Sequence, residues 1–146
     1  DRTNIKLWSV GCSSGQEPYT LSIVMSEYLR KNQTSIRDFS VLASDVSTRV
    51  LKKGINAVYE IDTITNLPLD LKKRYFLKGK NQFHNEVRIK PELRKHVKFM
   101  HLNVMNEDFG FRDTMQIIFC RNMLIYFDKP TQENVINTLM KQPLGF

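Results

Sequence analysis

The chain has 146 residues, of which 41% are hydrophobic and 25% are charged. This composition is typical of one soluble domain with a packed core, and it excludes a disordered chain. No run approaches the ~18 apolar residues that a membrane span needs, and the first residues lack the order of a signal peptide. We therefore expect a cytoplasmic protein without membrane insertion.

Cysteine usage narrows the possible chemistry further. Cys12 and Cys120 are the two cysteines of the chain, and they stand too far apart in sequence to form a CxxC pair. Two cysteines are also too few for a disulfide framework. We therefore expect reduced thiols and no bound metal.

Positive charge is concentrated in one segment. The chain carries 22 Lys and Arg against 15 Asp and Glu, a net charge of +7. Between residues 71 and 98, ten Lys and Arg stand against two Glu, so this segment accounts for the whole excess. Two interpretations remain open, a solvated lysine-rich face and a surface for an acidic partner.

The first third of the chain alternates strands and helices. Residues 5–10 form an apolar run that ends at Gly11, which predicts a strand and a tight turn. Residues 39–43 predict a second buried strand that leads into Asp45, after which Ser47 can cap a short helix. Between the two strands, a helix is predicted from apolar residues spaced three and four apart: Leu21, Val24, Met25 and Tyr28.

This alternation breaks between residues 58 and 96. A helix over residues 69–76 and short strands over residues 76–78 and 87–90 are separated by the polar run GKNQFHNE. The pattern therefore predicts an inserted segment rather than another strand and helix of the main sheet.

Two strands and a helix follow the insertion. The strands are predicted at residues 97–102 and 116–120, and Asp128 caps the helix with Pro130 in its first turn. One apolar face of that helix is predicted from Val135, Ile136, Leu139 and Met140. The final residues, QPLGF, read as a turn entering a further strand, so we interpret the chain as a fragment.

Strands that alternate with helices predict a mostly parallel sheet. Ligands of such sheets bind beyond the carboxyl ends of the strands, near the point where the strand order reverses. The first candidate there is the loop GCSSG, from Gly11 through Cys12 and Ser13 to Gly15, whose small residues let a ligand approach the backbone. Ser14-x-x-Glu17 also fits a capping box, which would give Glu17 a purely structural role.

Two other strand ends carry polar residues. Asp45 can accept hydrogen bonds from the hydroxyls of a ribose, or it can serve as an acidic residue at a helix N-terminus. Asn103 can address the edge of a base while Val104 packs against the ring, or Asn103 can be a turn residue. Together with the small-residue loop, these residues favour a ligand that contains adenosine.

The run FCRNMLIYF leaves the last predicted strand with three polar side chains, Arg121, Asn122 and Tyr126. An arginine is costly at such a place unless it has a partner, which is either a ligand or a structural ion pair. Cys120 is interpreted as a small buried residue, because no nearby histidine could activate it as a nucleophile.

Four segments, in this order and spacing, resemble the CheR family of chemotaxis receptor methyltransferases: WSVGCSSGQEPYTL, LASDVSTRVL, RYFLKG and IFCRNMLIYFDKPTQE. The resemblance implies a class I, Rossmann-like α/β fold with a mostly parallel sheet, helices on both faces and a small inserted antiparallel β-subdomain. Residues 1–146 would form the methyltransferase domain, incomplete at its C-terminus, and residues 60–96 the receptor-docking β-subdomain. The family's N-terminal helical domain and final strands would lie outside the chain.

The resemblance also implies an activity and its residues. Family members use S-adenosylmethionine, which becomes S-adenosylhomocysteine, to esterify glutamate side chains of chemoreceptors. The implied catalytic residues are Arg121 and Tyr126. The implied cofactor contacts are Gly11, Cys12, Ser13, Gly15, Glu17, Asp45, Asn103, Val104, Cys120, Arg121 and Asn122.

The implied partners are the cytoplasmic helices of chemoreceptors and, in some family members, a receptor tail peptide that binds the β-subdomain. We expect a monomer that is recruited to membrane receptor arrays. Two alternatives are weighed against this reading. A nucleic-acid methyltransferase would bind phosphates with the basic segment, but IFCRNMLIYF has neither an NPPY-like motif nor a placed cysteine nucleophile. A non-catalytic binding module would have lost pocket residues that this chain retains.

Overall fold

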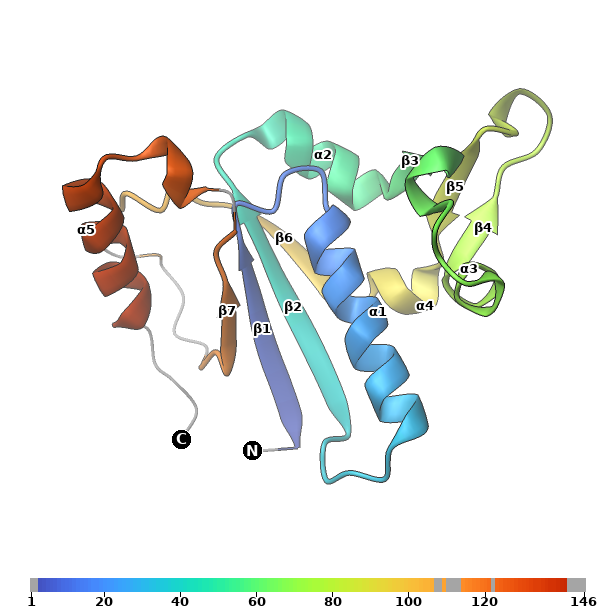
Figure 1. Cartoon of the computed structure of the whole chain (residues 1–146), viewed down its shortest axis with the longest axis horizontal. Coiled ribbons are helices and arrows are strands. Elements are labelled where there is room, and N and C mark those ends of the chain that lie inside the picture. Colours follow the sequence, from blue (N-terminus) through green and yellow to red (C-terminus); the bar gives the residue numbers. More distant parts are fainter. Residues whose placement is uncertain (1–2, 107–108, 110–113, 122, 142–146) are drawn as a thin grey trace.

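The computed structural model of the chain describes residues 3–106, 109, 114–121 and 123–141. A four-stranded parallel sheet forms the main unit, and a separate three-stranded antiparallel sheet lies beside it (Figure 1). Helices α1 (Gln16–Lys31) and α5 (Lys129–Met140) lie on opposite sides of the main sheet. The α/β class with an inserted antiparallel subdomain, predicted from the sequence, is confirmed.

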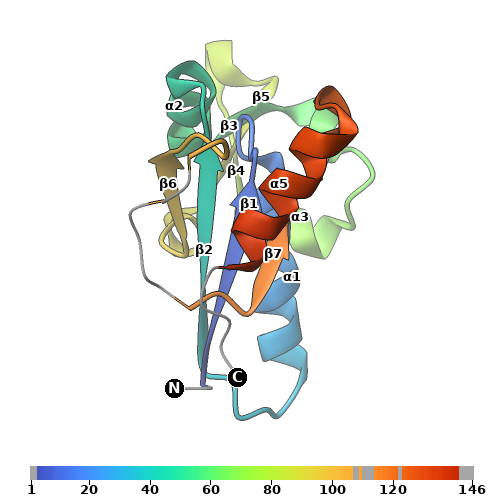
Figure 2. The same ribbon diagram turned by 90° about the vertical axis from the view of Figure 1, so that its left-hand side faces the viewer.

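The strand order of the main sheet fixes where a ligand can bind. The order is β6 (Val97–His101), β2 (Asp38–Asp45), β1 (Asn4–Val10) and β7 (Ile117–Phe119). All neighbouring strands are parallel, and their carboxyl ends point toward the same edge (Figure 2). The chain moves outward from β1 to β2 and β6 and then returns to β7, so the strand order reverses between β1 and β7.

One face of the sheet is covered by α1 and by α2 (Thr48–Asn56). The apolar contacts with α1 involve Leu7, Phe39 and Val41 of the strands and Leu21, Met25 and Leu29 of the helix. Leu51 of α2 packs with Ala43 of β2. Ser47 caps α2 as predicted, since its hydroxyl accepts a hydrogen bond from the backbone N–H of Val50.

The opposite face packs against α5. Val135 and Leu139 of this helix share a buried cluster with Trp8 and Val10 of β1. Asp128 caps the helix as predicted, with Oδ1 accepting from the Thr131 N–H at 3.0 Å. The two faces of the sheet are thus buried by different helices, as expected for a doubly covered sheet.

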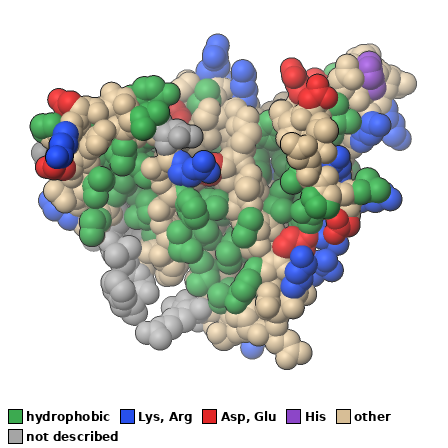
Figure 3. Space-filling view, in the orientation of Figure 1, with side chains coloured by type: hydrophobic (Ala, Val, Ile, Leu, Met, Phe, Trp, Pro, Cys, Tyr) green, Lys and Arg blue, Asp and Glu red, His purple; other side chains and the backbone are tan. Residues whose placement is uncertain are grey.

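The predicted apolar helix faces are only partly buried. Val24 and Tyr28 of α1 are 58% and 45% exposed, and Ile136 and Met140 of α5 are 40% and 66% exposed. The buried residues of α1 are instead Pro18, Tyr19 and Ser22. Hydrophobic side chains accordingly remain visible over α1 in the space-filling view (Figure 3).

The inserted sheet has the order β3 (Val58–Glu60), β5 (Glu86–Ile89) and β4 (Phe76–Lys78), with antiparallel pairing. It lies beyond α2, on the side of the molecule away from α5 (Figure 1). The sequence patterns predicted β4 and β5 but missed β3. Short helical segments complete the chain: η1 (Ile61–Ile64), α3 (Leu69–Tyr75), η2 (Asn81–Phe83), α4 (Pro91–Arg94) and η3 (Leu124–Tyr126).

No helix in the described part of the chain has the length and apolar character that crossing a membrane requires.

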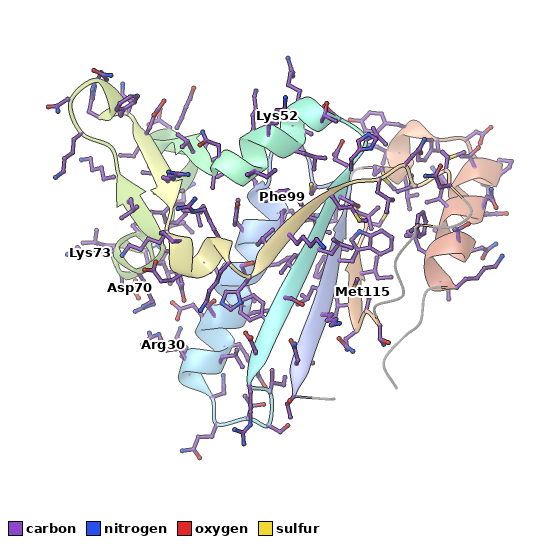
Figure 4. All side chains as sticks on the ribbon, turned by 180° about the vertical axis from the view of Figure 1, so that it is seen from behind. Arg30, Lys52, Asp70, Lys73, Phe99 and Met115 are labelled. Atoms are coloured by element: carbon purple, nitrogen blue, oxygen red, sulfur yellow. The ribbon has the colours of Figure 1, made fainter. Side chains whose placement is uncertain are left out.

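Gly54 allows α2 to pack closely on β6. A Cβ at this position would lie 2.4 Å from Phe99 Cε1, and Figure 4 shows Phe99 between β6 and α2. We expect Gly54→Ala to lower the free energy of unfolding by about 1–3 kcal/mol, the usual cost of overpacking. At an open helix position the same change would stabilise by about 0.5–1 kcal/mol.

Urea unfolding measures this difference. The matched control is Lys52→Ala, an exposed change on the same helix that is expected to stay within about 0.5 kcal/mol of the wild type. A Gly54→Ala protein that is more stable than the wild type would contradict the close contact.

Candidate cofactor-binding site

The loop between β1 and α1 has an unusual backbone. Gly11, Ser13 and Gly15 all have positive φ angles, of 70°, 52° and 99°. Glycine adopts this left-handed region without a steric penalty, whereas at Ser13 it requires support from neighbouring groups. The loop therefore depends on its surroundings for its shape.

The end of β2 supplies part of this support. The Cys12 N–H donates to the Ser44 carbonyl at 2.9 Å, and the Ser13 N–H donates to Asp45 Oδ2 at 2.9 Å. The other carboxylate oxygen, Oδ1, accepts from the Ser47 N–H at 3.0 Å. Asp45 thus joins the loop after β1 to the start of α2, and each of its oxygens retains a lone pair for a ligand hydroxyl.

Gly15 lies against two other elements. A Cβ there would be 2.8 Å from the Tyr59 hydroxyl and 3.1 Å from the Gly54 Cα. The same Tyr59 hydroxyl donates to the Ser14 carbonyl at 2.7 Å. The end of the loop, next to α1, therefore packs against α2 and β3.

Glu17 is oriented by the central strand. The buried Ser9 of β1 donates its hydroxyl hydrogen to Glu17 Oε1 at 2.8 Å. The capping-box interpretation of Ser14 and Glu17 is wrong, because the N-cap of α1 is the left-handed Gly15 and no side chain caps the helix. The Ser14 hydroxyl instead bonds to Gln16 Oε1.

Two carboxylates make the carboxyl edge of the sheet electronegative. Burial, followed by the negative charges of Asp45 and Glu17, raises the pKa of the Cys12 thiol to about 12. Burial and then Glu17 also raise the pKa of Cys120 at the end of β7. Both thiols therefore stay neutral at physiological pH, and the surrounding field favours a cationic ligand.

Asn103 and Val104 follow β6. Asn103 Oδ1 accepts from the Met105 N–H at 2.9 Å, so the turn interpretation is correct for this oxygen. This bond leaves the Nδ2 hydrogens of Asn103 out of the turn. Val104 is 7% exposed and packs in the cluster around Trp8, which limits how much of its side chain a ligand could contact.

The polar residues after β7 are the most open part of the site. Arg121 is exposed, and within the described ranges no ion pair involves it. Tyr126 lies in η3 with its side chain 81% exposed. Cys120 is half-buried, whereas Asn122 lies outside the described residues.

Comparison with known proteins identifies the family. The family described as "CheR methyltransferase, SAM binding domain" matches residues 1–143. The chain belongs to this family. It is 40% identical over 94% of its length to a "Chemotaxis protein methyltransferase" of Borreliella burgdorferi, of which it covers 47%. The counterpart from Escherichia coli K12 is 33% identical over 90% of the chain and 45% of the relative.

A "Chemotaxis protein methyltransferase 2" of Pseudomonas aeruginosa is 35% identical over 93% of the chain and 48% of the relative. The chain thus spans about half the length of the curated relatives that it matches. The matched region is the S-adenosylmethionine-binding domain of the CheR family.

The donor set of the CheR-family site fits that cofactor. S-adenosylmethionine carries a cationic sulfonium and a cationic ammonium group, and the edge of the sheet presents Glu17 and Asp45. At Gly11 a Cβ would lie 3.3 Å from the Met123 side chain. The glycine therefore allows the segment after β7 to approach the end of β1 closely. The site is thus electronegative and bordered by small residues where a cationic nucleoside would lie.

Sequence reasoning missed Ser9 and Tyr59. Ser9 had a usable signal, since it is a polar residue in an otherwise apolar strand directly before the loop. Tyr59 had none, because its partner Ser14 is 45 residues away.

Proposed function

We propose that this chain is the cofactor-binding and catalytic part of a methyltransferase that esterifies glutamate side chains of chemoreceptors. The observation that carries the proposal is the pair of carboxylates, Glu17 and Asp45, held beside a left-handed loop at the point where the strand order reverses. The family membership supports the same reaction class.

We propose a cofactor contact for each of these residues from the position of its side chain. Asp45 accepts hydrogen bonds from the ribose hydroxyls, and Glu17 faces the cationic methionyl end. Asn103 donates from Nδ2 to the adenine edge, with Val104 beside the ring. When bound, S-adenosylmethionine supplies an electrophilic methyl group.

The acceptor needs little chemical activation. A glutamate side chain is already ionised near neutral pH, so no residue of this chain has to remove a proton. The protein's task is to hold the acceptor oxygen in line with the methyl group, which can supply several kcal/mol of rate enhancement. The exposed guanidinium of Arg121 is suited to orient a carboxylate through two parallel hydrogen bonds. We assign Tyr126 to the lining of the space through which the acceptor carboxylate would enter.

The inserted sheet is proposed as the receptor-docking surface. A groove of about 550 Å³ opens on it, and its lining includes Ile61, Ile64, Leu69, Phe76 and Val87 together with Lys72, Lys73 and Lys78. In the described sheet, β4 is an edge strand and can accept a peptide strand through main-chain hydrogen bonds. The lysines favour an acidic partner. We place the protein, as a monomer, at the cytoplasmic side of receptor arrays.

Calorimetry with S-adenosylmethionine and S-adenosylhomocysteine tests the cofactor site. We expect Asp45→Asn to weaken binding by roughly 1–3 kcal/mol, because it removes the carboxylate that serves both the loop and the ribose. The matched control is Asp38→Asn at the opposite end of β2, where the carboxylate is 64% exposed. Equal affinities of Asp45→Asn and Asp38→Asn would remove Asp45 from the site.

Arg121 is tested by separating affinity from turnover. We expect Arg121→Ala to reduce receptor methylation at least about tenfold while cofactor affinity changes less than about twofold, because its proposed partner is the acceptor carboxylate. Arg121→Lys should rescue poorly, since an ammonium cannot form the paired contact. A parallel loss of affinity and turnover would show that Arg121 serves the cofactor or the fold instead.

Charge reversal tests the docking surface. Lys78 and Lys80 are exposed, whereas Arg88 and Lys90 bond to the carbonyls of Asn56 and Lys73 and are better left unchanged. We expect the double change Lys78→Glu and Lys80→Glu to reduce receptor methylation and its dependence on ionic strength, with cofactor affinity unchanged.

The control for this experiment has the same charge change at a distant edge. Lys31 and Arg37 are exposed and flank the loop between α1 and β2, at the amino edge of the sheet. Reversal of these two charges should leave methylation and its salt dependence near wild-type values. If the two double variants behave alike, the basic face of the inserted sheet is not the docking surface.

A further inference from the structure

The side chain of Tyr59 connects the inserted sheet to the cofactor loop. Tyr59 lies in β3, the strand with which the chain enters the insertion. Its hydroxyl donates to the carbonyl of Ser14 at 2.7 Å and lies 2.8 Å from where a Cβ on Gly15 would be. The loop thus contacts a residue outside the strand–helix unit to which it belongs.

Tyr59 is held in place by an aromatic cluster. Its ring packs edge-to-face on Tyr19 of α1, with centroids 6.3 Å apart, and Tyr19 packs on Phe99 of β6 at 5.8 Å. Burial raises the pKa of the Tyr59 phenol above its usual value, so the hydroxyl remains a donor. The cluster holds the ring in place, and the ring determines the position of the hydroxyl oxygen.

The bonded carbonyl belongs to the most constrained part of the loop. Ser14 stands between Ser13 and Gly15, both of which have left-handed φ angles. Asp45 holds the Ser13 N–H from the side of the sheet, and Tyr59 holds the Ser14 carbonyl from the side of the insertion. A backbone in this conformation persists when its surroundings determine it, so each of the two contacts contributes to the loop's shape.

We propose that Tyr59 is a positioning residue of the cofactor site, and that the inserted sheet helps to support this site through the Tyr59 hydroxyl. The inference rests on the proposed function, because it assigns the loop to cofactor binding. In this proposal Tyr59 acts on the site through the Ser14 carbonyl. Through this hydrogen bond the inserted sheet, which we propose as the docking surface, contacts the cofactor loop.

The test compares two single-hydroxyl deletions in the full-length protein. Tyr59→Phe removes the bond to the loop and keeps the ring. The matched control is Tyr19→Phe, which removes a buried hydroxyl that donates to the Gly54 carbonyl of α2 at the same distance, 2.7 Å. Calorimetry with S-adenosylhomocysteine, thermal unfolding and steady-state kinetics are measured for both.

We expect Tyr59→Phe to weaken S-adenosylhomocysteine binding about 3- to 10-fold, the range for loss of one hydrogen bond. KM for S-adenosylmethionine should rise by a similar factor, while kcat at saturating cofactor stays near the wild-type value. Tyr19→Phe should lower the melting temperature comparably yet bind within about twofold of the wild type. This split distinguishes positioning from a general loss of stability.

Hydrogen exchange supplies a second readout that needs no ligand. The Gly15 N–H donates to the Cys12 carbonyl at 3.2 Å inside the loop, and its exchange should be faster in Tyr59→Phe than in Tyr19→Phe. Unchanged exchange, or an affinity of Tyr59→Phe within twofold of a wild type that binds, overturns this inference alone. A wild type that fails to bind S-adenosylhomocysteine overturns the proposed function and this inference with it.

Discussion

The bidentate role of Asp45 is the interaction on which the site depends. Its two oxygens accept backbone N–H groups from the loop after β1 and from the start of α2. β1 and β2 are adjacent in the sheet, so these bonds fix the relative position of two strand ends where ligands of parallel sheets bind. The left-handed Ser13 is tolerated because Asp45 bonds to its N–H. The same carboxylate therefore adds negative charge to this edge of the sheet, supports the shape of the loop and bonds to the start of α2.

Much of the main sheet could be predicted from local patterns. Residues 5–10 and 39–43 are short apolar runs followed by small or acidic residues, and such patterns predict buried strands and their ends without knowledge of the rest of the chain. The caps at Ser47 and Asp128 are local as well, because each bonds to an N–H three residues later. β3 was missed because three residues have no measurable period, and it forms only by pairing with β5.

The candidate site divides in the same way. Some of its residues could be predicted from the neighbouring sequence, whereas others depend on contacts between segments that are far apart in the chain. Glu17 and Asp45 could be proposed from their positions after the first two strands, whereas the bond of Asp45 to Ser13 depends on the pairing of β1 with β2 and the bond of Glu17 to Ser9 depends on how α1 packs beside β1. The capping box failed because Gly15, with its left-handed φ, is the N-cap of α1, and the Ser14 hydroxyl bonds to the Gln16 side chain instead of a backbone N–H. The burial of Val24 was misjudged for a related reason, since spacing predicts that a helix has an apolar face but not which side meets the sheet.

The burial of Trp8 has a practical consequence. It is the one tryptophan in the chain, it is fully buried, and its indole N–H donates to the hydroxyl of Ser44 at 2.9 Å. Ser44 immediately precedes Asp45, so the indole is bonded to the strand end that carries the carboxylate. Tryptophan emission of these 146 residues therefore originates from one site beside the strand end that carries Asp45, so the domain contains an intrinsic optical probe of that region without any label.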